Sequence, residues 1–239
     1  QAWSRDYPDD LAAAYAYGLH LSFVDPDQAR EALLPVSAAD APEAVKSRIL
    51  LQGLDAALGS SSEEYRLVLI GQRLLEIREI DLAGQAFARA IDMNPLYAEA
   101  WAMLSEAQQL LGEDGWPALE QAGKLNPDSD IVRAEQALYY RRQGKPGQAL
   151  TALRALAADH PQDARWQIEI GAALAEQGDL IEAMGAYKKA TELEPANPLP
   201  WRALAAFAAE NGFDAQSISI PAAQKALELD DESAQSLDL

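Results

Sequence analysis

The sequence predicts an all-α solenoid, in which antiparallel helix pairs stack one after another. Three observations support this prediction. Prolines at positions 127, 161 and 195 are evenly spaced along the chain. Within that period, small and large apolar residues recur at fixed positions, and 49% of all residues are hydrophobic. A fixed period of about 20 to 50 residues is typical of proteins built from repeated structural units.

The N-terminal region, residues 1–62, is predicted to form three helices. Residues 9–23 and 25–36 form a helix pair, with Pro26 suited to the first turn of the second helix. Pro8 and Pro42 have the same spacing as the later prolines, so this pair is interpreted as a degenerate first repeat. A single helix follows over residues 42–58, and Gly59 opens a Ser-rich loop. We therefore expect an N-terminal region of residues 1–62 and an array of about five repeats over residues 63–239.

The two clearest repeats are residues 64–97 and 164–197, which carry matching residue types at the same offsets. The first contains Ile70, Gly71, Leu74, Ala83, Phe87, Ala90 and Pro95. The second contains Ile170, Gly171, Leu174, Ala183, Tyr187, Ala190 and Pro195. The turn between the two helices of a repeat is expected at Ile80-Asp81, Gln143–Lys145 and Gln177–Asp179.

The other repeats keep part of this pattern. Residues 98–129 are slightly shorter than a full repeat, and the repeat that begins at Pro198 has an insertion before Ala226. Trp101 and Trp201 are predicted to lie in the core, whereas the pattern leaves Trp116 and Trp166 undetermined. Residues 234–237 are expected to begin a further first helix, so the array is expected to be cut short at its C-terminal end.

This pattern resembles the tetratricopeptide repeat over residues 63–231. The resemblance implies a right-handed superhelical solenoid in which the small residue of each first helix contacts the second helix. Gly71, Ser105, Ala137, Gly171 and Ala205 occupy this small position. The resemblance also implies that the first helices line a concave groove that binds a protein or peptide segment.

The expected groove residues come from five successive first helices: Tyr65, Val68, Gln72, Glu99, Ala102, Glu106, Gln109, Ile131, Ala134, Leu138, Arg141, Arg165, Ile168, Ala172, Arg202 and Ala206. The candidate binding residues among them are Tyr65, Gln72, Glu106, Gln109, Leu138, Arg141, Arg165, Ile168 and Arg202. The family's clamp of Lys, Asn and Arg for a C-terminal carboxylate is absent from the matching positions, which argues against that mode of binding.

The charge balance restricts the kind of partner. With 38 acidic and 19 basic residues the net charge is −19, and no basic stripe is present, which argues against nucleic acid. Arg141, Arg165 and Arg202 come from successive repeats and are predicted to bind an acidic segment. The alternative is that each arginine pairs locally, with Glu135, Glu169 or Glu210.

No catalytic constellation, metal site or cofactor-binding residue is predicted. The chain has no cysteine, which excludes disulfides and thiolate chemistry. His20 lies in an apolar run and His160 in a turn between repeats, and neither has the partners of a catalytic or metal-binding histidine. Asn126, Asp128 and Asp130 alternate like the start of a calcium loop, but the required glycine and closing glutamate are missing.

The favoured function is therefore that of a non-enzymatic protein-binding scaffold, and three alternatives stay open. Exposed ends of the array could mediate self-association. The chain could be the soluble part of a membrane-anchored assembly factor, because its start without Met suggests an excised segment and its longest uncharged stretch, residues 11–24, is too short to span a bilayer. A small-molecule or catalytic site could involve Tyr15, Tyr17, His20 and Tyr65. The compartment is not determined.

Overall fold

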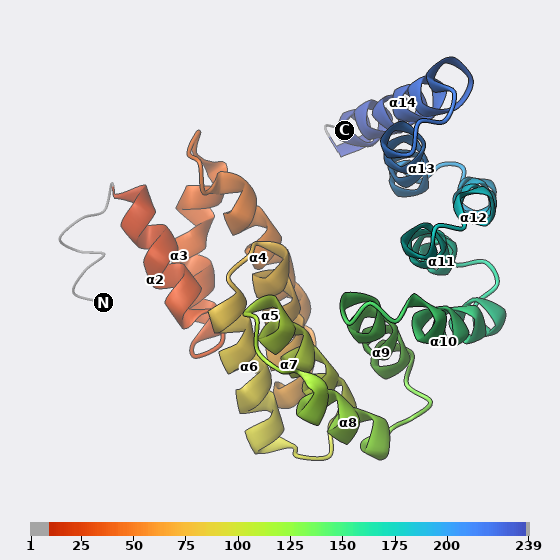
Figure 1. Cartoon of the computed structure of the whole chain (residues 1–239). Coiled ribbons are helices and arrows are strands. Elements are labelled where there is room, and N and C mark those ends of the chain that lie inside the picture. The colour runs from red at the N-terminus through yellow and green to blue at the C-terminus, as the bar shows by residue number, and fades with distance from the viewer. Residues whose placement is uncertain (1–9, 238–239) are drawn as a thin grey trace. The chain divides into compact units, whose positions relative to one another are not determined.

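The computed structural model describes residues 10–237, with side chains for residues 10–230, and this part of the chain is helical without any strand (Figure 1). The chain forms two compact units, residues 1–135 and 136–239, and the division falls inside one helix. The prediction of an all-α chain of helix pairs is confirmed. The predicted division after residue 62 stays a prediction.

The described helices of the first unit follow one another with short connections. They are α2 (Leu11–Leu21), α3 (Pro26–Ala38), α4 (Ala44–Leu58), α5 (Glu63–Glu76), α6 (Ile80–Met93), α7 (Ala98–Leu110) and α8 (Trp116–Leu125). Each packs against the next along the chain, and α4 lies between α3 and α5. One continuous apolar core runs from α2 to α7, so the N-terminal helices share their core with the first clear repeat.

The next helix, α9 (Asp130–Arg142), contains the division between the two units. The second unit then contains α10 (Pro146–Asp159), α11 (Ala164–Gln177), α12 (Leu180–Leu193), α13 (Pro198–Glu210), the π-helix η1 (Ala215–Ser219) and α14 (Ile220–Leu237). Here too, consecutive helices pack in pairs, and the first helices α11 and α13 also contact each other. Helices that are neighbours in sequence are therefore neighbours in space, as repeat architecture requires.

Short oxygen side chains fix where several helices begin. The Asp25 carboxylate accepts a hydrogen bond of 3.1 Å from the Gln28 amide, and Pro26 occupies the first turn of α3. The Ser62 hydroxyl accepts one of 3.2 Å from the Tyr65 amide at the start of α5. Both caps satisfy N–H groups that lack a partner within the helix. The predicted helix starts near residues 25 and 63 are confirmed.

The turns inside the repeats match the prediction at two of three places. Gly144 and Gly178 adopt left-handed backbone angles, with φ of 65° and 88°, which end the first helix of each pair. The predicted turn at Ile80 and Asp81 is wrong, because both residues lie in the first turn of α6. The turn is formed one residue pair earlier, at Arg78, which has a φ of 69°. Because glycine is the usual residue with a positive φ, an arginine at this position does not indicate a turn in the sequence.

The small residue of each clear repeat lies against a ring of the second helix. A Cβ atom at Gly71 would lie 2.4 Å from Cε1 of Phe87, and one at Gly171 would lie 2.9 Å from Cε2 of Tyr187. The Tyr187 ring then stacks on Phe207 of the next repeat, with centroids 4.7 Å apart. The predicted contact of Gly71 and Gly171 with the second helix is confirmed, and so is the predicted filling toward the next pair by Tyr187.

In the shortened repeat, residues 98–129, the two helices meet at backbone atoms and not at an aromatic ring. Gly115 precedes α8, and a Cβ atom there would lie 2.6 Å from the Ser105 carbonyl oxygen. The Gln109 side-chain amide donates a 3.1 Å hydrogen bond to the Ser105 hydroxyl. The deletion is therefore accommodated by a glycine that lets the two helices approach without an intervening side chain.

The tryptophans of the repeats do not all lie where the pattern places them. The indole N–H groups of Trp101 and Trp201 donate to the carbonyl oxygens of Pro95 and Pro195, at 2.9 and 3.0 Å, and both side chains are only partly buried. The prediction that they lie in the core is thus wrong in part: each ties a first helix to the preceding turn. Trp166, undetermined by sequence, is buried.

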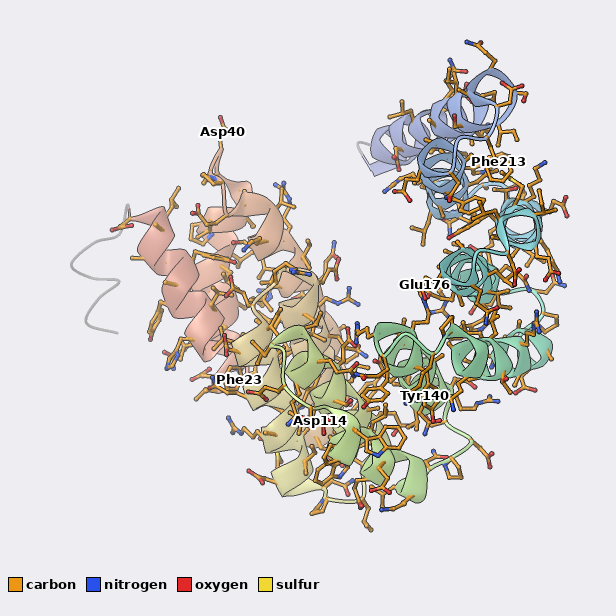
Figure 2. All side chains as sticks on the ribbon, viewed as in Figure 1. Phe23, Asp40, Asp114, Tyr140, Glu176 and Phe213 are labelled. Carbon is orange, nitrogen blue, oxygen red and sulfur yellow. The ribbon has the colours of Figure 1, made fainter. Side chains whose placement is uncertain are left out.

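The last described repeat ends differently from the prediction. Phe213 packs on Phe207, with ring centroids 5.5 Å apart, and the insertion forms η1 (Figure 2). Residues 234–237 belong to α14 and do not begin a new helix. The reason is local, since no proline or glycine interrupts α14 after its second residue.

Candidate functional site

In the first unit, the candidate site is the face that α5 and α7 share. Tyr65 of α5 is exposed, and Gln72 lies two turns further along the same helix. The Gln72 side-chain nitrogen lies 3.6 Å from the sulfur of Met103, which joins this part of α5 to α7. Glu106 and Gln109 of α7 are half-buried. The face therefore mixes an aromatic ring, amides and a carboxylate.

Carboxylates dominate the charge near the N-terminal ends of α5 and α7. The backbone N–H of Glu64 and the Ser62 hydroxyl hold the pKa of Glu64 below its usual range. Glu99 accepts a hydrogen bond of 2.7 Å from the Ser129 hydroxyl. Burial, reinforced by the charge of Glu99, raises the pKa of the Tyr97 phenol to about 12, so this group stays neutral and can donate. This end of the face is therefore suited to bind polar or basic groups of a ligand.

In the second unit, Arg141 joins α9 to α11. Its guanidinium contacts Glu169 at 2.5 Å and Glu176, which is labelled in Figure 2, at 2.6 Å. Only 19% of the Arg141 side chain is exposed. Burial disfavours the charge on Arg141, but the two carboxylates outweigh this effect and raise its pKa. Burial also raises the pKa of Glu169, although Arg141 opposes that shift. This contact agrees with the alternative that the arginines pair with acidic residues of the chain, and Glu169 is one of the residues that the alternative names.

The other two arginines also have acidic partners. Arg165 contacts Asp163 at 2.6 Å and lies over the Trp166 ring, 5.4 Å from its centroid. Arg202 contacts Asp230 at 2.7 Å. Pairing within the chain is thus observed for both, but the partners Asp163 and Asp230 are not among the residues that the alternative names. Binding of an acidic segment by these arginines stays a prediction, and such a ligand would have to compete with these carboxylates.

The nine candidate binding residues all lie on first helices of the repeats, and none is buried. They divide between the units: Tyr65, Gln72, Glu106 and Gln109 in the first, and Leu138, Arg141, Arg165, Ile168 and Arg202 in the second. Two other expected groove residues, Val68 and Ala102, are buried in the apolar core, so that expectation is wrong. The reason is close helix packing, which leaves a narrower exposed stripe than spacing alone suggests.

The residues named for a possible small-molecule site differ in exposure and in their contacts. His20 is exposed, whereas Tyr15 is buried, and burial raises the pKa of Tyr15 to about 12. Tyr17 donates a 3.4 Å hydrogen bond to Gln28. Among the side chains of residues 10–230, no three histidine or acidic groups are placed to hold a metal ion. No helix in the described part of the chain is long and apolar enough to cross a membrane.

Comparison with known proteins agrees with the repeat geometry. A family model described as tetratricopeptide repeat matches residues 68–114 and 134–198, which include both ring-against-glycine pairs. The chain contains tetratricopeptide repeats. No curated protein sequence matches this repeat chain significantly.

Solved structures of MamA are similar in fold to this tetratricopeptide-repeat chain. MamA from Desulfovibrio magneticus RS-1, residues 41 to the end, is 20% identical with a TM-score of 0.50, and covers 71% of this chain and 96% of its own. An RS-1 double mutant gives 20% identity and a TM-score of 0.52 over 71% and 96% of the two chains. A further MamA structure gives 23% and 0.50, over 70% and 98%. At these identities the likeness shows the fold alone.

Proposed function

We propose that the chain is a non-enzymatic scaffold that binds a protein or peptide segment along the first helices of its repeats. Tetratricopeptide folds are typical of protein–protein interaction scaffolds. The observation that carries the proposal is the face of α5 and α7, where Tyr65, Gln72, Glu106 and Gln109 keep contact with solvent while the opposite side of both helices is buried. Such a mixed surface on rigid helices supplies apolar area and hydrogen bonds together.

The test is site-directed photocrosslinking followed by measurement of affinity. A photoreactive phenylalanine analogue at position 65 is expected to crosslink a protein from the source lysate, whereas the same group at Gln85, exposed on α6, is not. The affinity of the identified partner is then expected to fall at least tenfold when Tyr65 and Gln72 are both replaced by alanine. A Gln85→Ala control should leave it unchanged.

Two outcomes would contradict the proposal. Equal crosslinking from positions 65 and 85 would show that the labelled protein does not recognise this face. Unchanged affinity in the double variant, with an unchanged far-ultraviolet circular dichroism spectrum, would show that recognition lies elsewhere.

Arg165→Glu and Arg202→Glu, measured with the same partner, test the prediction that the arginines bind an acidic segment. An acidic partner should bind these variants more weakly, and its binding should depend less on salt concentration.

Self-association is a second candidate function, favoured by the exposed apolar side of α14. Ile220 and Leu227 are separated by two helical turns, hence lie on the same side of the helix, and Leu227 is 64% exposed. If this side joins two copies, Leu227→Glu should convert a dimer into a monomer in light scattering. Gln148→Glu adds the same charge at an exposed position of α10 and should change nothing. A wild-type monomer at all accessible concentrations would exclude this function.

A further inference from the structure

A cavity of about 260 Å³ lies in the first unit, away from the α5 and α7 face. Its walls come from the connection between α2 and α3, the first residue of α3, and helices α5 and α6. The lining residues are Phe23, Val24, Pro26, Glu63, Arg66, Leu67, Ile70 and Arg89. Ligand pockets for drug-sized molecules have about 300–1,000 Å³, so this cavity suits a smaller group.

One side of the cavity is apolar and firmly held. Leu67 and Ile70 of α5 are almost completely buried, and Phe23 is buried in the connection between α2 and α3. Val24 also lines the cavity and is 53% exposed. The cavity therefore presents a preformed apolar surface with access from solvent, which a short aliphatic group can fill.

The other side carries two guanidinium groups whose charge is incompletely balanced. Arg89 is fixed by a 2.8 Å hydrogen bond from its Nη1 to the Phe23 carbonyl oxygen, and its Nη2 lies 3.8 Å from Glu63. The Nε of Arg66 is shielded from solvent and has no hydrogen-bond partner within the described part of the chain. The chain has a net charge of −19, so carboxylates outnumber basic groups, and yet this arginine nitrogen beside the cavity has no acceptor within the described part of the chain.

The net charge of the cavity lining indicates which class of ligand the cavity can bind. Arg66 and Arg89 contribute two positive charges and Glu63 one negative charge, so the cavity lining has a surplus of one positive charge. A buried N–H donor that lacks an acceptor is unfavourable, and an anionic oxygen is the strongest acceptor for a guanidinium. Arginine pairs with carboxylates in a planar, two-bond geometry that lysine does not offer.

We propose that this cavity binds a carboxylate attached to a small aliphatic group, with Arg66 and Arg89 holding the carboxylate and Phe23, Leu67 and Ile70 enclosing the aliphatic part. Two sources share this chemistry: a free short-chain carboxylic acid, and the C-terminal residue of a peptide with an aliphatic side chain. The site uses neither Tyr65 nor Gln72, so it is independent of the proposed scaffold function.

The probes are 4-methylpentanoate and its neutral amide, titrated by calorimetry into the full chain. The carboxylate is expected to bind with a dissociation constant on the order of millimolar, and the amide at least tenfold more weakly. A decapeptide that ends in leucine, with a free or an amidated C-terminus, distinguishes the two sources. Tighter binding of the free-ended peptide than of 4-methylpentanoate identifies a peptide terminus, and the reverse identifies the small acid.

Three variants separate the charge of the site from the stability of the unit. Arg66→Met should weaken the carboxylate at least tenfold, and Glu63→Gln should strengthen it several-fold, because it removes the competing negative charge. Arg73→Met removes the same charge from α5 outside the cavity lining and should leave binding unchanged. Thermal unfolding of each variant shows whether the fold is retained.

These opposite signs make the proposal falsifiable. It is overturned if neither 4-methylpentanoate nor the free-ended peptide binds, if carboxylate and amide bind equally, or if Arg66→Met and Arg73→Met weaken binding to the same extent. A folded Glu63→Gln variant with weakened binding also overturns it, since that result would mean that Glu63 contributes a ligand contact.

Discussion

Gly71→Ala is expected to lower the free energy of unfolding by about 1–3 kcal/mol, because the new Cβ atom has no room. That atom would lie 2.4, 2.8 and 2.9 Å from three carbons of the Phe87 ring, well inside normal contact distance. The ring is itself fully buried, and side chains in protein cores are closely packed, so movement of the ring is costly. Chemical denaturation followed by circular dichroism measures the loss.

Two comparisons show whether steric contact is the cause. Gly185 lies in α12 with no atom within 4 Å of its would-be Cβ, so Gly185→Ala should raise stability by about 0.5–1 kcal/mol through helix propensity alone. In a Phe87→Leu background, which shortens the opposing side chain, Gly71→Ala should cost distinctly less than in the wild type. An equal cost in both backgrounds would refute contact between residues 71 and 87 as the cause.

The sequence predicts this packing because the partners occupy fixed places in a short repeat. The separation between Gly71 and Phe87 equals that between Gly171 and Tyr187, and both pairs recur with the prolines. Local helix pairing needs only such short-range information, since consecutive helices of a repeat pack together. The fold was therefore predictable from the positions of small and aromatic residues.

Other features depend on details that periodicity does not carry. The turn before α6 uses a left-handed Arg78, although glycine usually marks that conformation. Trp101 packs against the core but is only partly buried, and its indole N–H donates to the Pro95 carbonyl oxygen, whereas apolar spacing alone predicts a core position. A hydrogen bond to a backbone atom in the preceding turn leaves no trace in residue type, so such departures become visible only in three dimensions.

The candidate site was less predictable than the fold because many carboxylates compete for each arginine. Arg141 of α9 reaches Glu176, near the far end of α11, as well as Glu169, and the sequence pattern does not indicate the contact with Glu176. The cavity beside Arg66 depends on where the connection between α2 and α3 meets α5 and α6, and no motif in the sequence marks that meeting. Side-chain pairing across helices is set by rotamers and packing, which a one-dimensional pattern does not specify.

Arg141→Ala is expected to lower the free energy of unfolding at pH 7 by about 1–3 kcal/mol, because it leaves two carboxylates without their shared cation. This loss is smaller than that for a fully buried ion pair, since the Glu169 side chain keeps 34% and the Glu176 side chain 41% of its exposure. Urea denaturation of the wild type and the variant measures the difference. Arg154→Ala, at an exposed position of α10, serves as the matched control and should have little effect.

The loss should depend on pH in one direction. Burial already places the pKa of Glu169 above its ordinary value of 4.5, whereas the charge of Arg141 lowers that pKa. Removal of Arg141 should therefore raise the pKa of Glu169 further. A carboxyl group whose pKa is raised in the folded state binds its proton more tightly in the folded than in the unfolded chain. Stability therefore falls as the pH rises from the pKa of the unfolded state toward the raised pKa of the folded state. The cost of Arg141→Ala should therefore be larger at pH 7 than at pH 5.

Glu169→Gln identifies the group responsible. In the Arg141→Ala background this substitution removes the charge that needs the arginine, so it should recover part of the lost stability at pH 7 and flatten the pH dependence between pH 5 and pH 7. If Arg141→Ala costs the same at both pH values, and Glu169→Gln recovers nothing, the contribution of Arg141 comes from the packing of its aliphatic stem between α9 and α11 and not from its charge.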